Sequence, residues 1–296
     1  MLGDLTTEKR NEKTMNLDEM STEAFLKIMN GEDAKVAYII KENILYITEA
    51  VNNIITSLKS GGRLIYLGAG TSGRLGLLDA VECPPTFGTD PKEVIGLIAG
   101  GNEAFIQAVE GAEDNEELGR NDLQSIHLTD SDIVVGIAAS GRTPYVIGGL
   151  QYANDIGAAT VAVSNNRNST IGRVAKTKIE VDCGPEVLSG STRLKAGTAQ
   201  KMILNMLSTA SMVGVGKTYQ NLLVDLQPTN EKLKERAKKI IMEATQCDFS
   251  TAEAYFKMAN YETKTAIIML LTDLSYDEAV ECLKKTEGSI HKTIEK

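Results

Sequence analysis

Five short apolar runs in the middle of the chain constrain its fold more than any other feature. They are RLIYL (63–67), EVIGLIA (93–99), DIVVGIAA (132–139), ATVAVS (159–164) and TKIEVD (177–182). Each run is continuously apolar rather than alternating, which is typical of strands in a parallel sheet covered on both faces. Helical segments fall between most of them. The sequence therefore predicts an α/β fold with a doubly wound, five-stranded parallel sheet.

Helical sequence is expected on both sides of this sheet. Ser21 is a suitable N-cap for a first helix, and a long amphipathic helix is expected to run to the Gly61–Gly62 stop. A buried helix is expected from about residue 192, and three short helices are expected after Cys247. We predict three parts: an N-terminal helical arm (1–45), the α/β domain (46–228) and a C-terminal helical region with a small bundle (229–296).

Charge and cysteine usage exclude several classes of protein. The formal net charge is −9, whereas a general nucleic-acid binder is more often basic. No run of about 18 apolar residues predicts a membrane span, and the N-terminus lacks the apolar stretch of a secretory signal. The four cysteines are far apart and form no CxxC pair, which favours reduced thiols in the cytoplasm over a zinc ribbon or a disulfide scaffold.

Two loops rich in Gly, Ser and Thr follow the first and third predicted strands: LGAGTSGRLG (67–76) and AASGRTPYV (138–146). In a sheet of order 2-1-3-4-5 these strands are neighbours, and ligands bind outside their carboxyl ends. Each loop also leads into a helix N-terminus, whose free N–H groups attract an anion. The sequence therefore predicts a phosphate site made by Ser72, Gly73, Ser140, Gly141, Arg142 and Thr143.

Other interpretations of the glycines are weaker. Gly68, Gly70 and Gly73 match a dinucleotide fingerprint, but the second strand ends in IAGGN, without the expected acid. GVGKTY (214–219) lacks the first glycine of a P-loop, since Ser211 occupies that position, and it follows a helix rather than a strand. Ordinary strand-to-helix turns remain the alternative to a phosphate site.

Two carboxylates are candidates for acid–base chemistry. Glu82 lies in LLDAVECPPTFGTD (77–90), where the prolines are expected to end a helix at Cys83. Its position suits either a solvated helix end or a rigid acid at the rim of a cleft. Glu113 belongs to an acidic run (109–119) that is mostly typical of a solvated helix face. The run lies between the second and third predicted strands, and this connection begins at the mouth of the crevice onto which the two loops are expected to open. Two carboxylates beside a phosphate site suggest general acid–base work on a sugar phosphate.

The motifs of the chain resemble a known family over nearly its whole length. GAGTSGRLGLLDAVECPPTFG, VEGAEDN, ASGRTPYV, SGSTRLKAGTAQK and NLLVDLQPTNEKL together resemble the N-acetylmuramic acid 6-phosphate etherases, as do LTTEKRN and MSTEAFLKIMNGED. That family has the sugar isomerase (SIS) fold, and the glucokinase regulatory protein is similar to it. The resemblance implies a SIS sugar-phosphate domain over 46–228 and a ubiquitin-associated-like bundle at the C-terminal end.

The resemblance also implies an activity: cleavage of the D-lactyl ether of N-acetylmuramic acid 6-phosphate by elimination and rehydration, in cytoplasmic recycling of cell-wall sugar, with no metal or redox cofactor. Glu82 is implied as the acid for the lactate oxygen and Glu113 as the base for the carbon-2 proton. Ser189, Ser191 and Lys195 are implied as further ligands, and a homodimer is implied as the assembly. An aldose–ketose isomerase and a non-enzymatic sugar-phosphate sensor of the same fold are the alternatives.

Overall fold

The computed structural model describes residues 5–107, 109–226, 228 and 230–295. The chain divides into two compact units, one of residues 1–81 and 92–208 and the other of residues 82–91 and 209–296. The predicted boundaries at 45 and 228 stay predictions, and Thr229, where the C-terminal region was expected to begin, lies outside the described residues, as do residues 1–4 of the expected arm.

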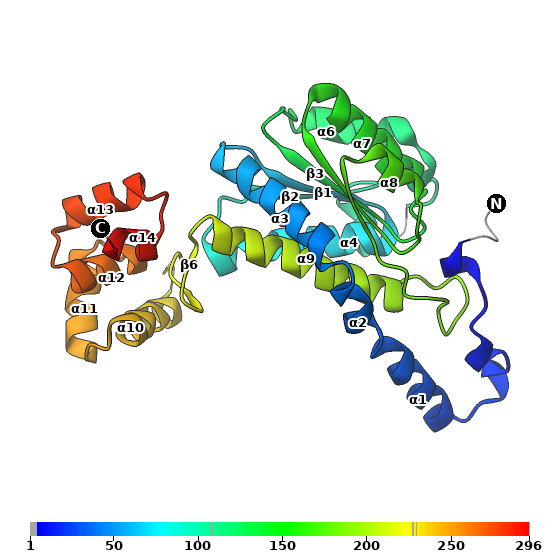
Figure 1. Ribbon diagram of the computed structural model, residues 1–296, viewed down its shortest axis with the longest axis horizontal. Coiled ribbons are helices and arrows are strands. Elements are labelled where there is room, and N and C mark those ends of the chain that lie inside the picture. Colours follow the sequence, from blue (N-terminus) through cyan, green and yellow to red (C-terminus); the bar gives the residue numbers. More distant parts are fainter. Residues whose placement is uncertain (1–4, 108, 227, 229, 296) are drawn as a thin grey trace. The chain divides into compact units, whose positions relative to one another are not determined.

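The first unit contains a single five-stranded sheet with the predicted order. Its strands lie in the order β2-β1-β3-β4-β5, and every neighbouring pair is parallel (Figure 1). The strands are β1 (Leu64–Gly68), β2 (Val94–Ile98), β3 (Ile133–Ala138), β4 (Ala159–Ser164) and β5 (Thr177–Glu180). All five predicted strands and the doubly wound arrangement are therefore confirmed. β1 and β3 are neighbours, so the loops that follow them leave the same edge of the sheet.

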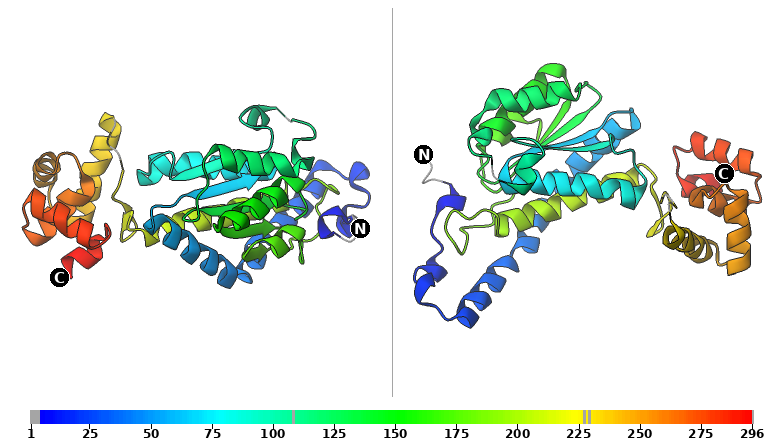
Figure 2. Two further views of the ribbon diagram at one scale, coloured as in Figure 1. Left: turned by 90° about the horizontal axis from the view of Figure 1, so that it is seen from above. Right: turned by 180° about the vertical axis from the view of Figure 1, so that it is seen from behind.

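Helices cover both faces of the sheet (Figures 1 and 2). On one face Ile65 and Val134 pack in a cluster with Tyr145 and Leu150 of one adjacent helix. On the other face, a Cβ added to Gly76 would lie 2.9 Å from the Cβ of Tyr66, so this glycine lets its helix approach the sheet closely. The first face carries α6 (Glu116–Ser125), α7 (Pro144–Ile156) and α8 (Thr170–Val174), and the second carries α3 (Ile44–Lys59), α4 (Gly70–Phe87) and α9 (Lys195–Gly214).

The N-terminal arm begins with three short 3-10 turns, η2 (Thr6–Glu8), η3 (Glu12–Thr14) and η4 (Leu17–Glu19), followed by α1 (Thr22–Asp33). Ser21 caps α1 as predicted, because its hydroxyl accepts a hydrogen bond from the N–H of Ala24 at 3.3 Å. The single long helix expected next is wrong. The segment forms two helices instead, α2 (Val36–Lys41) and α3. The side-chain Nδ2 of Asn43, which lies between them, donates to the carbonyl of Ile39 at 3.1 Å. Such a local side-chain bond competes with the hydrogen bonds of a continued helix.

The prediction that the prolines end a helix at Cys83 is also wrong. Helix α4 continues to Phe87 with Pro84 and Pro85 inside it. The φ angle of proline suits a helix, and its missing N–H costs least near a helix end, where burial of Cys83 and Phe87 holds the last turn in place. The helix ends instead at Gly88, which has a φ of +64° and donates to the carbonyl of Pro84 at 2.9 Å.

The second unit is mostly helical. A short antiparallel pair, β6 (Thr218–Tyr219) and β7 (Leu222–Leu223), precedes helices packed around one apolar cluster that includes Ile241, Phe256 and Ile267. These helices are α10 (Glu231–Thr245), α11 (Phe249–Met258), α12 (Thr263–Thr272), α13 (Tyr276–Lys285) and α14 (Ile290–Ile294). In the described part of the chain, four short helices follow Cys247 rather than the three expected, because Gly288 separates the five residues of α14 from α13.

Candidate active site

The first predicted phosphate loop joins β1 directly to α4. Helix α4 begins at Gly70, which has a φ of +54°, a conformation that favours glycine. A Cβ on Gly73 would lie 2.6 Å from the carbonyl oxygen of Gly68, so only glycine allows the helix to start this close to the strand. The first N–H groups of α4 therefore lie immediately beside the carboxyl end of β1, where they can bind an anion.

The second predicted loop has a similar construction. Gly141 is buried with a φ of +68°, and a Cβ there would lie 2.4 Å from the Cβ of Ser169. Its carbonyl accepts from Ile171 at 3.0 Å, and the N–H of Arg142 donates to the hydroxyl of Ser140 at 3.3 Å. Thr143 precedes α7 without making a side-chain cap, and Arg142 is exposed. The loop thus presents hydroxyls and one cation at the start of a helix.

Glu113 lies at the mouth of the first loop. It is on the 3-10 turn η5 (Ala112–Asp114), and its side chain is exposed. It lines a cavity of about 200 Å³, which we call the loop cavity, together with Ala69, Gly70, Arg74, Ala99, Ala104, Val109, Glu110 and Gly111. The acidic run and the start of α4 therefore line one cavity within the first unit, although Glu113 lies 43 positions after Gly70 in the chain.

Arg74 is a residue of this cavity that the sequence analysis missed. Its Nε donates to the carbonyl of Phe105 at 2.9 Å, and its Nη2 donates to that of Ala104 at 2.7 Å. These bonds tie α4 to the short helix α5 (Glu103–Ile106) at the start of the connection that carries Glu113. The only local signal was an arginine inside the Gly-rich loop, GTSGR, which could have marked a cation near the anion site.

Ser72 is buried beneath the first loop. Its hydroxyl donates to Oε1 of Gln200 at 2.9 Å, and Nε2 of Gln200 in turn donates to Oδ1 of Asn165 at 2.9 Å. A phosphate oxygen accepts hydrogen bonds and cannot donate them, so Ser72 would serve it through its backbone N–H or after its hydroxyl turned away from Gln200. This polar chain links the first loop to the loop that follows β4.

Ser189 and Ser191 lie in the loop that precedes α9, close to the N-terminal arm. Ser189 is exposed, and its hydroxyl lies 3.5 Å and 3.4 Å from the carbonyl oxygens of Glu8 and Lys9. The N–H of Ser191 donates to the carbonyl of Leu188 at 3.0 Å. The structure therefore brings Ser189 against the arm, and the role of both serines as ligands stays a prediction.

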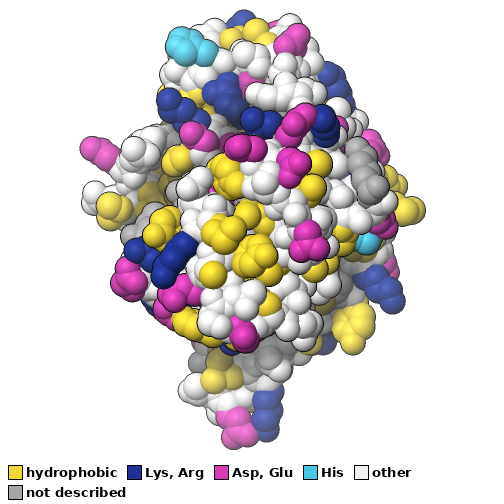
Figure 3. Space-filling model, turned by 90° about the vertical axis from the view of Figure 1, so that its left-hand side faces the viewer, with side chains coloured by type: hydrophobic (Ala, Val, Ile, Leu, Met, Phe, Trp, Pro, Cys, Tyr) yellow, Lys and Arg dark blue, Asp and Glu magenta, His cyan; other side chains and the backbone are white. Residues whose placement is uncertain are grey.

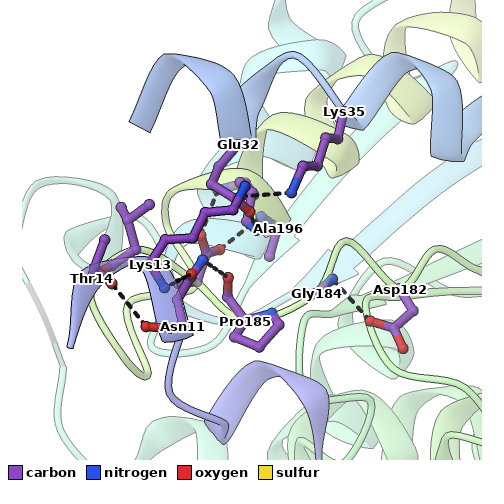
Figure 4. A network of polar contacts seen from close by, with 12 residues as sticks. Asn11, Lys13, Thr14, Glu32, Lys35, Asp182, Gly184, Pro185 and Ala196 are labelled. Carbon is purple, nitrogen blue, oxygen red and sulfur yellow. Dashed lines mark hydrogen bonds and ion pairs between the residues drawn. The ribbon is translucent and has the colours of Figure 1, made fainter. Parts of the chain in front are cut away.

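Lys195 belongs to a buried ionic network rather than being an open cation. The network is centred on Glu32, which Figure 4 shows with Lys13 and Lys35. The side chain of Lys195 is 2% exposed, and its Nζ lies 2.7 Å from Oε2 of Glu32. Lys13 and Lys35 bind the other oxygen of Glu32 at 3.0 Å and 2.6 Å. Burial raises the pKa of Glu32, but the hydrogen bonds from the three lysines outweigh it and lower the pKa to about 2. Glu186 accepts from the N–H of Lys195 at 3.0 Å and so caps α9.

Glu82 is the predicted site residue that the first unit does not contain. It is exposed on α4, and it begins the short segment 82–91 that belongs to the second unit. Cys83 beside it is buried, in accord with a packed thiol. The pairing of Glu82 with Glu113 therefore stays a prediction. Both carboxylates are exposed in the single chain, so the partly desolvated environment that suits acid–base work would have to come from a ligand or from a second subunit.

Comparisons with known proteins decide the family. Residues 46–154 match the glucokinase regulatory protein N-terminal SIS domain, and residues 113–210 match the SIS domain. An N-acetylmuramic acid 6-phosphate etherase of Exiguobacterium sp. is 60% identical over 99% of this chain and all of its own length, and one of Oceanobacillus iheyensis is equally similar. The chain belongs to the N-acetylmuramic acid 6-phosphate etherase family. The phosphoheptose isomerase of Neisseria gonorrhoeae is similar in fold to this etherase-family chain, with a TM-score of 0.50 and 14% identity over 64% of this chain and 98% of its own.

The charge on one face, the length of the helices and the grouping of metal-binding side chains can be described for this structure. On the face shown in Figure 3, acidic and basic side chains are interspersed with hydrophobic ones, and those drawn there form no continuous basic field. No helix in the described residues is both long and apolar enough to cross a bilayer. Within the same residues, no three Asp, Glu, His or Cys side chains are grouped so that they could hold a metal ion.

Proposed function

We propose that the protein cleaves the D-lactyl ether of N-acetylmuramic acid 6-phosphate and releases N-acetylglucosamine 6-phosphate and D-lactate. The observation that carries the proposal is 60% identity, over essentially the whole chain, to relatives that bear the name of this activity. The loop cavity supports it, because Glu113 faces the same space as the first turn of α4. The identity to named etherases favours a carbon–oxygen lyase over an isomerase or a sensor of the same fold.

The proposed reaction begins with the open-chain aldehyde of the sugar. Glu113 takes the proton from carbon 2, the carbon 3–oxygen bond breaks, and Glu82 gives a proton to the departing lactate oxygen. Glu82 then takes a proton from water, which adds to carbon 3 of the unsaturated aldehyde, and Glu113 returns its proton to carbon 2. Atoms and charges balance without an external oxidant or reductant.

Substrate binding is assigned to the two helix-start loops. The phosphate would lie against the first N–H groups of α4 and the Ser140–Thr143 loop, with Arg142 as the cation. Ser189 and Ser191 are assigned to the sugar. Lys195 is already paired with Glu32, so its contribution is to hold the start of α9 in place.

The assembly and location belong to the same proposal. We propose a cytoplasmic homodimer in which the second subunit helps to exclude water from the exposed carboxylates. Light scattering on the purified protein tests the dimer, and a monomer at micromolar concentration would reject it.

Lactate release from N-acetylmuramic acid 6-phosphate is the decisive assay. Glu82→Gln and Glu113→Gln should each lower the rate by about 10² to 10⁴-fold, the usual contribution of one acid or base. Glu117→Gln is the matched control, because this carboxylate belongs to the same acidic run but lies on the exposed surface of α6. In D₂O, Glu113→Gln should also stop deuterium entering at carbon 2. Isomerisation of the substrate without lactate release would favour the isomerase alternative. Continued deuterium exchange at carbon 2 in Glu113→Gln would show that Glu113 is not the carbon-2 base.

A further inference from the structure

The second unit contains a cavity that the proposed reaction does not use. It has a volume of about 480 Å³, within the range of small-molecule sites, and we call it the bundle cavity. All of its residues belong to the second unit. They are Gly88, Lys217, Val224, Asp225, Leu226, Pro228, Tyr261, Glu262, Thr263, Lys264, Thr265, Val280, Leu283, Lys284 and Gly288.

Positive charge exceeds negative charge in this cavity. Two lysines share one carboxylate: Nζ of Lys264 lies 2.8 Å from Oδ1 of Asp225, and Nζ of Lys217 lies 3.5 Å from its Oδ2. Lys284 adds a third cation, and Glu262 is the second acid. The carboxylate of Glu262 already accepts from Thr265 at 2.8 Å. Three lysines against two acids leave one formal positive charge for a ligand to neutralise.

Lys264 is the most enclosed of these cations. Its side chain is 12% exposed, and its Nζ also donates to the carbonyl of Gly216 at 2.9 Å. An ammonium group has three donors, and the described residues account for two of them. Burial lowers the pKa of Lys264, and the nearby Asp225 only partly restores it. A bound anion would stabilise the charged form and take the third donor.

The N-terminus of α12 lies at the same place. Residues 262–265, which line the cavity, form its first turn, and Glu262 at the N-cap makes no side-chain cap. Thr263 is 2% exposed, and its hydroxyl has no hydrogen-bond partner in the described part of the chain. A buried hydroxyl without a partner is uncommon and calls for an explanation. An uncapped helix start beside a spare ammonium donor is suited to an oxyanion.

The rest of the lining is apolar. Val224, Leu226, Val280 and Leu283 form a wall, and Tyr261 adds an aromatic ring. A mostly apolar wall with a few convergent polar groups is typical of a site for a small organic ligand. We propose that the bundle cavity binds a small organic anion, with its carboxylate or phosphate on Lys264 and the first turn of α12 and its apolar body against Val280 and Leu283.

The test places a fluorescent reporter in the cavity. The chain has no Trp, and Tyr261 lines the cavity and is 49% exposed, so Tyr261→Trp gives a single reporter there. The full-length Tyr261→Trp protein is titrated with benzoate, phenyl phosphate and inorganic phosphate at constant ionic strength. Binding is measured directly, so the result does not depend on the proposed reaction.

At least one of the two organic anions should saturate the signal, and their comparison identifies the preferred charged group. Inorganic phosphate should bind about tenfold more weakly or worse, because it lacks an apolar body to bury. In the same background Lys264→Met should weaken organic-anion binding by about tenfold or more, since a hydrogen bond to a charged group is lost. Val280→Phe should also weaken it by filling the cavity, while it keeps every charge.

Lys285→Met is the matched control. This lysine lies on α13, the helix that carries Val280. It is paired with Glu281 at 2.6 Å and does not line the cavity, so binding should be unchanged. The proposal is overturned if neither organic anion saturates the signal, if sodium chloride reproduces it, or if Lys264→Met and Val280→Phe both bind as tightly as the parent. Thermal unfolding of each variant shows whether it is folded.

Discussion

The buried network around Glu32 makes a sharp prediction about stability. Glu32→Gln keeps the shape of the side chain but removes the only carboxylate bound to Nζ of Lys195 among the described residues. Lys195 is 2% exposed, so its ammonium group would remain buried without a directly bonded carboxylate. Lys13 and Lys35 would lose the same partner, but their side chains are 60% and 48% exposed and water can replace it.

The loss of unfolding free energy expected for Glu32→Gln follows from this difference in burial. Breaking a buried ion pair by removing one partner costs about 3–5 kcal/mol, whereas an exposed i,i+4 pair contributes about 0.3–0.5 kcal/mol. Glu23→Gln is the matched control, because Glu23 binds Lys27 at 2.6 Å on the surface of α1 with both side chains more than 70% exposed. Urea unfolding followed by far-UV circular dichroism measures both variants. A loss for Glu32→Gln within about 1 kcal/mol of the control would refute the reasoning.

The same network predicts a pH dependence. The folded-state pKa of Glu32, about 2, lies below its ordinary value of 4.5. Its contribution to stability is therefore complete above pH 4.5 and is lost as the pH falls from 4.5 towards 2. Glu32→Gln should flatten the stability profile in that window. Adding Lys195→Met should recover part of the loss, since an apolar side chain suits a buried position better than an unpaired charge. A double variant no more stable than Glu32→Gln would contradict this account.

Three further predictions concern the first unit. Gly141→Ala should raise KM for the sugar phosphate and lower the melting temperature, because the φ of Gly141 is positive and a Cβ there would meet Ser169. Gly31→Ala is the control, since there is open space around Gly31, and it should change neither quantity. Equal effects of the two substitutions would contradict the argument. Arg74→Met should raise KM at least tenfold by freeing α5 from α4, and an unchanged KM would separate Arg74 from the site. Asn166→Ala should speed tryptic cleavage of the arm several-fold, because this side chain binds the arm; an unchanged rate would mean that other contacts hold it.

The sheet could be predicted because each strand carries its own signal. The run IVVGIA in β3 is apolar and buried at every position, and burial on both faces is the environment that suits it. The two loops were predictable for a related reason, since Gly73 and Gly141 occupy places where a Cβ would collide. Helix ends were less predictable. Pro84 and Pro85 would normally end a helix, but burial of Phe87 outweighs the lost hydrogen bonds, and this burial depends on residues distant in the chain.

The site was predictable in part. Glu113 could be placed near the first loop because connections after parallel strands begin at one edge, and it lines the loop cavity with Gly70. Arg74 was missed because its partners are backbone carbonyls, which have no sequence signature. Lys195 resembled an open cation in its motif, but its partner Glu32 lies 163 positions earlier, and no local pattern joins the two.

The contact between the arm and Asn166 has a consequence for synthesis of the chain. The N–H of Thr6 donates to Oδ1 of Asn166 at 2.8 Å, across a separation of 160 positions. At 5–20 residues per second the ribosome needs roughly 8–32 s to make that intervening length. The arm therefore waits, without its native partner, until four of the five strands have been translated. A nascent chain of this protein has to carry its arm free for most of its elongation, within reach of chaperones and proteases.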